Sequence, residues 1–175
     1  MSRAFVGLGA NLGTPREAIE AAIATIASHP GLTLTGTSGL YRSAPLDAQG
    51  PDFLNAVIRI ESTLDAEHLL TVLQQIEMQA GRERPYPNAP RTLDLDLLLF
   101  DEQVMESTIL TLPHPRMHQR AFVLHPLAEI DADLRIPGQG ALRDLLMGCA
   151  DQLIARVGPL PPRTPSGSPG QAQQR

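Results

Sequence analysis

Apolar and polar positions follow each other along the chain in patterns that predict interleaved strands and helices. Residues 3–9 form a short apolar run ended by glycine, which is typical of a buried strand. A helix is expected next, because the Thr14 hydroxyl can cap it, Pro15 suits its first position and Glu17 completes a capping box. Apolar residues at helical spacing then predict a buried helix face that ends near residue 30.

Period-two alternation predicts one strand over residues 32–41 and another over residues 53–60. In the second strand, Phe53, Asn55 and Val57 share one face, because successive side chains of a strand point to opposite sides. An aromatic ring and an amide therefore stand side by side on the face opposite the aliphatic residues.

The second half of the chain continues the alternation of helices and strands. A helix is predicted over residues 65–80, followed by a proline-rich loop over residues 82–90 that should be exposed. A leucine-rich strand over residues 93–100 is interrupted only by Asp94 and Asp96. The remaining expected elements are a strand pair near 104 and 109–112, a helical stretch over 116–130 interrupted at Pro126, and a last helix over 141–156.

The short loops between strands favour an α+β fold, with a mixed or antiparallel sheet and helices on its faces, over a doubly wound parallel sheet. A length of 175 residues with 42% hydrophobic content suffices for one core, so residues 1–157 are expected to form a single domain. Residues 158–175 are rich in Pro, Gly and Ser and predict a flexible tail, with a partner-binding proline motif as the alternative.

Charge and cysteine content narrow the function classes. A net charge of -5 with scattered basic residues disfavours a protein that holds nucleic acid by bulk charge. Cys149 is the single cysteine, which excludes an intramolecular disulfide and leaves no sign of a structural zinc site. The chain shows no leader sequence and no run of roughly 18 apolar residues, so we expect a soluble cytoplasmic protein without a membrane partner.

Asp94 and Asp96 are the first candidates for chemistry, because two strand residues one position apart project from the same face. Two anions about 7 Å apart among leucines are costly unless a cation or a group of hydrogen-bond donors compensates them. Carboxylate oxygens suit Mg²⁺ and leave positions for phosphate oxygens and water. The pattern alone leaves three interpretations open: a metal site, a structural ion-pair cluster and a solvated strand edge.

Cationic residues surround the aspartates in the sequence. Arginine forks can bind phosphate oxygens in pairs, which suggests a polyphosphate substrate, although each arginine singly could be ordinary surface. His114 lies between two prolines and could either donate to a phosphate or be structural. The segment from Gly7 to Gly13 matches no nucleotide-binding fingerprint and is interpreted as a strand-to-loop turn. The arginines in question are Arg82, Arg84, Arg91, Arg116 and Arg120.

Four segments together carry a family resemblance: VGLGANLG, YRSAPLDAQGPDFLNAV, IEMQAGRERPYPNAPRTLDLDLLLF and LTLPHPRMHQRAFVLHPLAEI. RTLDLDLLLF followed by LPHPRMHQRAFVL is highly specific, whereas two alternating aspartates alone are not. Over about residues 3–148 the chain resembles the 6-hydroxymethyl-7,8-dihydropterin pyrophosphokinases of folate biosynthesis. The resemblance implies a monomeric, ferredoxin-like α+β enzyme that transfers pyrophosphate from ATP to the pterin.

The resemblance also implies residue roles. Asp94 and Asp96 would bind two Mg²⁺ ions that bridge the phosphates of the co-substrate ATP, and Arg82 and Arg91 would neutralise the transferred group. ATP would be contacted by Gln74, Glu77, Arg84, Leu97, Thr111, His114 and Arg120. The pterin would be held by Phe53 and Phe122 on its two faces and, at its edge, by Asn55 and backbone groups of Ser43 and Leu46.

Two other function classes compete with this interpretation. A non-catalytic pterin- or nucleotide-binding descendant of the enzyme is disfavoured because every catalytic position is filled. A metal-dependent nuclease would need further carboxylates and a basic groove, which conflicts with the acidic net charge.

Overall fold

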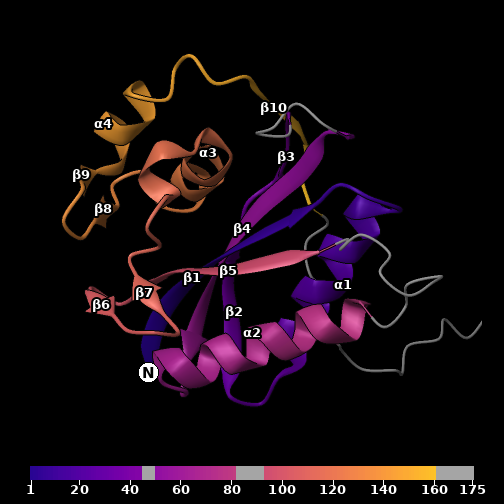
Figure 1. The fold of residues 1–175 in the computed structure, drawn as a ribbon, viewed down its shortest axis with the longest axis vertical. Helices are drawn as coiled ribbons and strands as arrows, with labels where there is room; N and C mark the ends of the chain where they lie inside the picture. The colour runs from indigo at the N-terminus through magenta and orange to yellow at the C-terminus, as the bar shows by residue number, and fades with distance from the viewer. Residues whose placement is uncertain (45–49, 82–92, 161–175) are drawn as a thin grey trace, which may run out of the picture.

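The computed structural model describes residues 1–44, 50–81 and 93–160, which form an antiparallel sheet with helices on both faces (Figure 1). The main sheet has six strands in the order β10-β3-β4-β1-β5, with β2 also paired to β4. The expected α+β class is therefore confirmed, and of the two sheet types expected, mixed or antiparallel, the sheet is antiparallel. In chain order the elements are β1 (Ser2–Ala10), α1 (Pro15–Ser28), β2 (Leu32–Thr37), β3 (Leu40–Ser43), β4 (Phe53–Ser62), α2 (Ala66–Gly81), β5 (Asp94–Phe100), β6 (Met105–Glu106), β7 (Thr111–Leu112), the short 3-10 turn η1 (Met117–Gln119), α3 (Ala121–Ile130), β8 (Arg135–Ile136), β9 (Gly140–Ala141), α4 (Leu142–Met147) and β10 (Ile154–Gly158).

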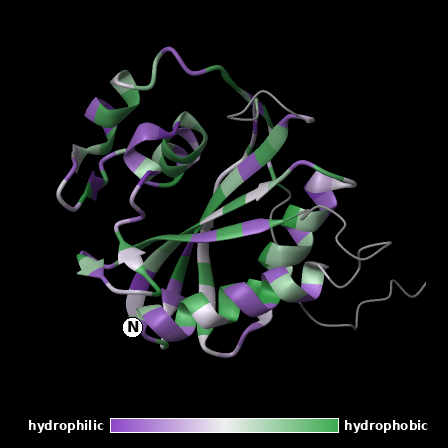
Figure 2. Ribbon diagram, in the orientation of Figure 1, coloured by the Kyte–Doolittle hydropathy of each residue, from purple (hydrophilic) through white to green (hydrophobic). Residues whose placement is uncertain are grey.

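The sheet separates two hydrophobic clusters. Helices α1 and α2 cover one face, where Val6 and Leu8 of β1 are buried against them, and α3 covers part of the other face, where Phe5 and Val57 are buried. Hydrophilic and hydrophobic residues alternate along α2 in Figure 2, as expected for a helix with one buried side. No helix within the described ranges has the length and apolar composition that crossing a bilayer requires.

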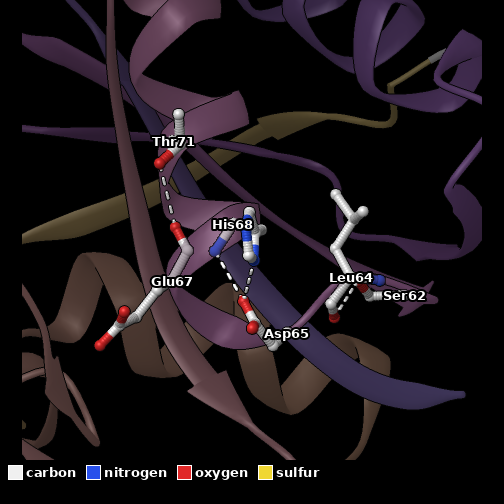
Figure 3. Close-up of polar contacts among 6 residues, drawn as sticks. All are labelled: Ser62, Leu64, Asp65, Glu67, His68 and Thr71. Carbon is white, nitrogen blue, oxygen red and sulfur yellow. Dashed lines mark hydrogen bonds and ion pairs between the residues drawn. The ribbon is translucent and has the colours of Figure 1, made fainter.

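The two long helices of the first layer begin differently. Asp65 precedes α2, and its Oδ1 accepts hydrogen bonds from the backbone N–H of His68 at 2.8 Å and from His68 Nδ1 at 2.7 Å (Figure 3). The expected capping box at α1 is wrong, because the Thr14 side chain makes no capping hydrogen bond. With ψ at 78°, Thr14 lies outside the fully extended conformation that directs a cap hydroxyl at the helix.

The single strand expected over residues 32–41 is two strands, β2 and β3, which both pair with β4. The break falls at the buried Ser38, whose Oγ accepts the backbone N–H of Val57 at 2.9 Å and donates to the Gly39 carbonyl at 2.8 Å. At Gly39 a Cβ would lie 2.8 Å from the backbone carbonyl oxygen of Gly158 in β10, which cannot move aside as a flexible side chain can, so only glycine fits there.

The last expected helix, over residues 141–156, is correct in its first half and wrong in its second. Helix α4 ends at Met147, and the chain returns as β10, which pairs antiparallel with β3. The edge of β3 offers unpaired backbone groups, and the β-branched Ile154 and Val157 suit a strand better than a helix. Leu160 is buried in the core, beyond the boundary expected at residue 157.

Pro126 lies inside α3 and does not interrupt it. Its missing N–H removes one helical hydrogen bond. Burial of the flanking Val123, Leu124 and Leu127 against the sheet keeps the helix continuous. The local penalty at the proline is therefore overridden by tertiary packing.

Candidate active site

A cavity of about 200 Å³ lies over the face of the sheet that α3 leaves partly uncovered. Strand register builds its floor from two rows of residues. Asp94 of β5, Gly9 of β1 and Asn55 of β4 form the first row. The second row, formed by Asp96, Gly7 and Val57, is parallel to it. The cavity is lined by Gly7, Leu8, Gly9, Ser43, Ala44, Phe53, Asn55, Ala56, Val57, Asp94, Asp96, Arg120, Phe122 and Val123.

The glycines of β1 are functional candidates that the sequence interpretation missed. The segment was interpreted as a strand-to-loop turn, but Gly7 and Gly9 lie within β1 and line the cavity. A Cβ at Gly9 would come within 3.2 Å of Asn55 Nδ2. Glycine inside a strand often marks a place where another group approaches the backbone closely. Their period-two spacing was the available signal, since it puts both glycines on one face.

Two aromatic rings face the cavity from different elements. Phe53 extends from the start of β4, and Phe122 from the first turn of α3. The guanidinium carbon of Arg120, which precedes α3, lies 5.4 Å from the centroid of the Phe122 ring. The expectation that Phe53 and Asn55 share a face is correct, because both line this cavity.

A hydrogen bond between neighbouring strands fixes the amide of Asn55. Ser43 Oγ donates to Asn55 Oδ1 at 2.7 Å, and both residues are buried. Buried polar side chains are rare among the described residues. The Ser43 hydroxyl and the Asn55 carbonyl oxygen satisfy each other's hydrogen-bonding needs in part. The hydrogen bond therefore positions the amide at the cavity floor, with Oδ1 towards Ser43.

The aspartate pair presents two exposed carboxylates on one face of the edge strand β5. Within the ranges that the structure describes, no group of three or more His, Cys, Asp or Glu side chains could hold a metal ion. A hard cation bound here would take two protein carboxylates and complete its shell with substrate oxygens and water, a set that suits Mg²⁺. The donor chemistry of Asp94 and Asp96 therefore fits a magnesium ion shared with a phosphate substrate.

His114 is held next to this carboxylate pair. Its backbone N–H donates to the Leu98 carbonyl at 2.9 Å, and its Nδ1 accepts the backbone N–H of Arg116 at 3.2 Å. Burial lowers the pKa of His114, the Asp96 carboxylate opposes this, and Arg120 and Arg116 lower it further. The neutral ring therefore carries its proton on Nε2, which becomes a hydrogen-bond donor.

The other ATP-contact residues that the structure describes lie outside the cavity lining. Gln74 and Glu77 are on α2, and Glu77 Oε2 accepts the backbone N–H of Leu95 at 3.0 Å along the outer edge of β5. Thr111 is on β7, which contacts β5. The side chain of Leu97 is buried in the core on the α1 and α2 side, opposite Asp96.

The structure thus brings seven of the expected site residues together around one cavity: Ser43, Phe53, Asn55, Asp94, Asp96, Arg120 and Phe122. Four others, Leu46, Arg82, Arg84 and Arg91, lie outside the described residues. The roles expected for these four remain predictions.

The fold and the cavity define an α+β domain with a small-molecule site on the open face of an antiparallel sheet. The family model of 7,8-dihydro-6-hydroxymethylpterin-pyrophosphokinase (HPPK) matches residues 5–132. The chain belongs to this family. The family and the enzyme class expected from the sequence, a pyrophosphokinase among the transferases, are therefore confirmed.

Relatives cover nearly the whole chain. The 2-amino-4-hydroxy-6-hydroxymethyldihydropteridine pyrophosphokinase of Pseudomonas aeruginosa is 44% identical over 158 residues, which span 90% of this chain and 98% of that protein. Its namesake in Haemophilus influenzae is 41% identical over 160 residues, 91% of this chain and 100% of that protein. The fold is also similar to a crystal structure of Plasmodium falciparum HPPK-DHPS, with a TM-score of 0.66 at 12% identity, covering 83% of this chain and 44% of that longer one.

Proposed function

We propose that this chain transfers pyrophosphate from ATP to 6-hydroxymethyl-7,8-dihydropterin, giving AMP and the pterin pyrophosphate in tetrahydrofolate biosynthesis. The observation that carries the proposal is a single cavity with the Asp94 and Asp96 carboxylates on one side and Phe53, Asn55 and Phe122 on the other. A flat heteroaromatic ring binds best between aromatic faces with a few polar groups at its edge. The family membership agrees with both halves of this arrangement.

Asp94 and Asp96 would hold magnesium, as two ions that enter with ATP. When bound, the metal supplies positive charge that neutralises the phosphates. The two carboxylates orient that charge toward the cavity, because both project from the same face of β5. Gly7 and Gly9 of β1 lie between the two aspartates and Asn55. Because these glycines have no side chains, the reacting groups of both substrates have room there.

The triphosphate would be bound by cationic and hydrogen-bonding groups beside the aspartates. Arg120 lines the cavity, and His114 offers Nε2–H from its neutral ring. We assign the remaining nucleotide contacts to Gln74, Glu77, Arg84, Leu97 and Thr111, and the charge neutralisation at the transferred group to Arg82 and Arg91. Gln74, Glu77 and Thr111 lie on α2 and β7, which both contact β5, and this supports a nucleotide site outside the cavity.

The chemical step would be an in-line displacement. The hydroxymethyl oxygen of the pterin forms a bond to the β-phosphorus, while the bond from that phosphorus to the oxygen bridging to the α-phosphate breaks, and AMP leaves with that oxygen. The hydroxyl proton is lost to solvent. The chain contributes positioning, since Phe53 and Phe122 fix the ring and Asn55, with backbone groups of Ser43 and Leu46, fixes its edge.

We further propose that the enzyme works as a cytoplasmic monomer on small molecules alone. The net charge of -5 disfavours a nucleic-acid partner, and the single cysteine suits a reducing compartment. Size-exclusion chromatography with light scattering would measure the oligomeric state directly.

The test is an assay of the purified chain with ATP, Mg²⁺ and the hydroxymethyl dihydropterin, with AMP and the pterin product separated by chromatography. We expect both products in equal amounts, and neither when Mg²⁺ is chelated. Binding of the pterin without AMP formation would identify a non-catalytic binding protein. Cleavage of added DNA or RNA would favour a nuclease, and either result would overturn the proposal.

A further inference from the structure

The amide of Asn55 is held between two residues that lie on either side of it in the sheet. On the β3 side, Ser43 Oγ donates to Oδ1 at 2.7 Å. On the β1 side, Nδ2 lies next to Gly9, where an added side-chain carbon would be 3.2 Å away. Ser43 is 8% exposed and Asn55 5%, so water competes little for this arrangement.

The two ends of a carboxamide have nearly the same shape but opposite hydrogen-bonding character. Without a partner, the Asn55 amide could rotate and offer a ligand either its oxygen or its nitrogen. The Ser43 hydroxyl engages the oxygen, and the absence of a side chain at Gly9 leaves space for the nitrogen. In this orientation the amide N–H of Asn55 is a hydrogen-bond donor at the cavity floor.

We infer that Ser43 is a positioning residue whose hydroxyl sets Asn55 as a hydrogen-bond donor to the heterocyclic substrate, and that Gly9 keeps the space this orientation needs. The inference rests on the proposed function, in which Asn55 contacts the pterin edge. It adds a specificity rule: the substrate must present an acceptor, a ring nitrogen or a carbonyl oxygen, at the atom that meets Nδ2. A site built to donate rejects analogues without that acceptor, because its buried donor would be left unpaired.

The test compares variants of the full-length chain in steady-state kinetics. Ser43→Ala should raise KM for the pterin roughly fivefold to tenfold, because one buried hydrogen bond is lost. KM for ATP should stay close to that of the wild type, while the melting temperature should fall by only a few degrees through loss of the same hydrogen bond. Ser43→Thr restores the hydroxyl and should return KM for the pterin to near the wild-type value. A merely structural role for the serine would instead raise KM for both substrates in Ser43→Ala.

Gly9→Ala should also raise KM for the pterin, since the added methyl presses on Nδ2. Its matched control is Gly36→Ala in β2, where the added carbon would lie at a similar 3.1 Å from Ile130 but outside the cavity lining. The control for the serine is Ser62→Ala, because the Ser62 hydroxyl is buried and, among the described residues, hydrogen-bonds to the backbone of Leu64 only. Both controls should leave KM for the pterin unchanged.

Asn55 variants separate failure of the inference from failure of the proposed function. If Asn55→Ala leaves KM for the pterin unchanged, the proposed pterin contact is wrong and the inference falls with it. If Asn55→Ala raises KM but Ser43→Ala matches the wild type, the inference alone is overturned. Should Ser43→Ala not fold, Asn55→Asp decides, because this carboxylate of equal shape has no donor. Wild-type KM in that variant would overturn the donor assignment.

Discussion

The carboxylate of Glu129, near the end of α3, accepts the backbone N–H of Gly39 at 2.6 Å. Its second oxygen accepts Nε of Arg156 in β10 at 2.8 Å. One side chain thus ties α3 to the turn between β2 and β3 and to the last strand. The first turn of the same helix carries Phe122 into the cavity. The network therefore anchors the helix at the end away from the site.

We expect Glu129→Gln to lower the free energy of unfolding by about 1–2 kcal/mol, because a charge-assisted hydrogen bond and an ion pair are weakened together. The Glu129 side chain is only 28% exposed, so solvent screens the pair less than it would at the open surface. Urea denaturation would measure the change. Asp133→Asn is the control, since its ion pair with Arg143 is highly exposed and should contribute less than about 0.5 kcal/mol. Equal losses in the two variants would contradict the anchoring role.

Asp65 makes the stability of the domain depend on pH. The backbone and side-chain hydrogen bonds from His68 lower the pKa of Asp65 below its usual value of 3.8. The folded protein therefore binds this proton less readily than the unfolded chain, and stability rises with pH through this range. The contribution is present above pH 3.8 and is lost as the pH falls through the folded-state pKa.

Asp65→Ala should accordingly lower the melting temperature at pH 6. The gap to the wild type should narrow as the pH is reduced below about 4, because the wild type then loses its charged cap. Melting curves by circular dichroism at several pH values would show this. A gap that is constant with pH would mean that the ionised carboxylate is not the group that stabilises α2.

Asp96→Ala should reduce turnover by a factor of roughly 10³ or more, because one of two proposed metal carboxylates is lost. The domain should remain folded, since Asp96 is exposed and lies at the sheet edge. Turnover and Mg²⁺-dependent ATP binding are the measurements, with Glu102→Ala as an exposed carboxylate control just beyond β5. Activity at the wild-type level in Asp96→Ala would rule out the metal role.

Phe53→Ala should raise KM for the pterin by a factor of about ten, through loss of one stacking face, and leave KM for ATP unchanged. Phe53→Tyr keeps the aromatic face and should behave like the wild type. The two KM values from initial-rate kinetics separate ring stacking from a general disturbance of the site. A parallel rise in both would indicate that Phe53 supports the fold and does not contact the pterin.

Short-range periodicity predicted most of the framework, including α2 and the face that Phe53 shares with Asn55. Periodicity failed where the conformation of a segment is decided by the strand that it pairs with. The β-branched Ile154 and Val157 are only a weak local signal for a strand, because the strand conformation of these residues depends on the free edge of β3. The role of Gly7 and Gly9 in the cavity likewise depends on which residues of β4 and β5 lie beside them. Comparison with short nucleotide-binding motifs could not provide that information.

Gly7 and Gly9 of β1 line the cavity without side chains, and this affects how the site could become resistant to an inhibitor. Resistance commonly arises when a side chain that touches the drug is trimmed or exchanged. A compound seated on the main chain of these two glycines offers no such side chain to remove. Every substitution there adds atoms, and at Gly9 they would press on the Asn55 amide that we assign to the natural substrate. Escape at that position would therefore also weaken binding of the substrate.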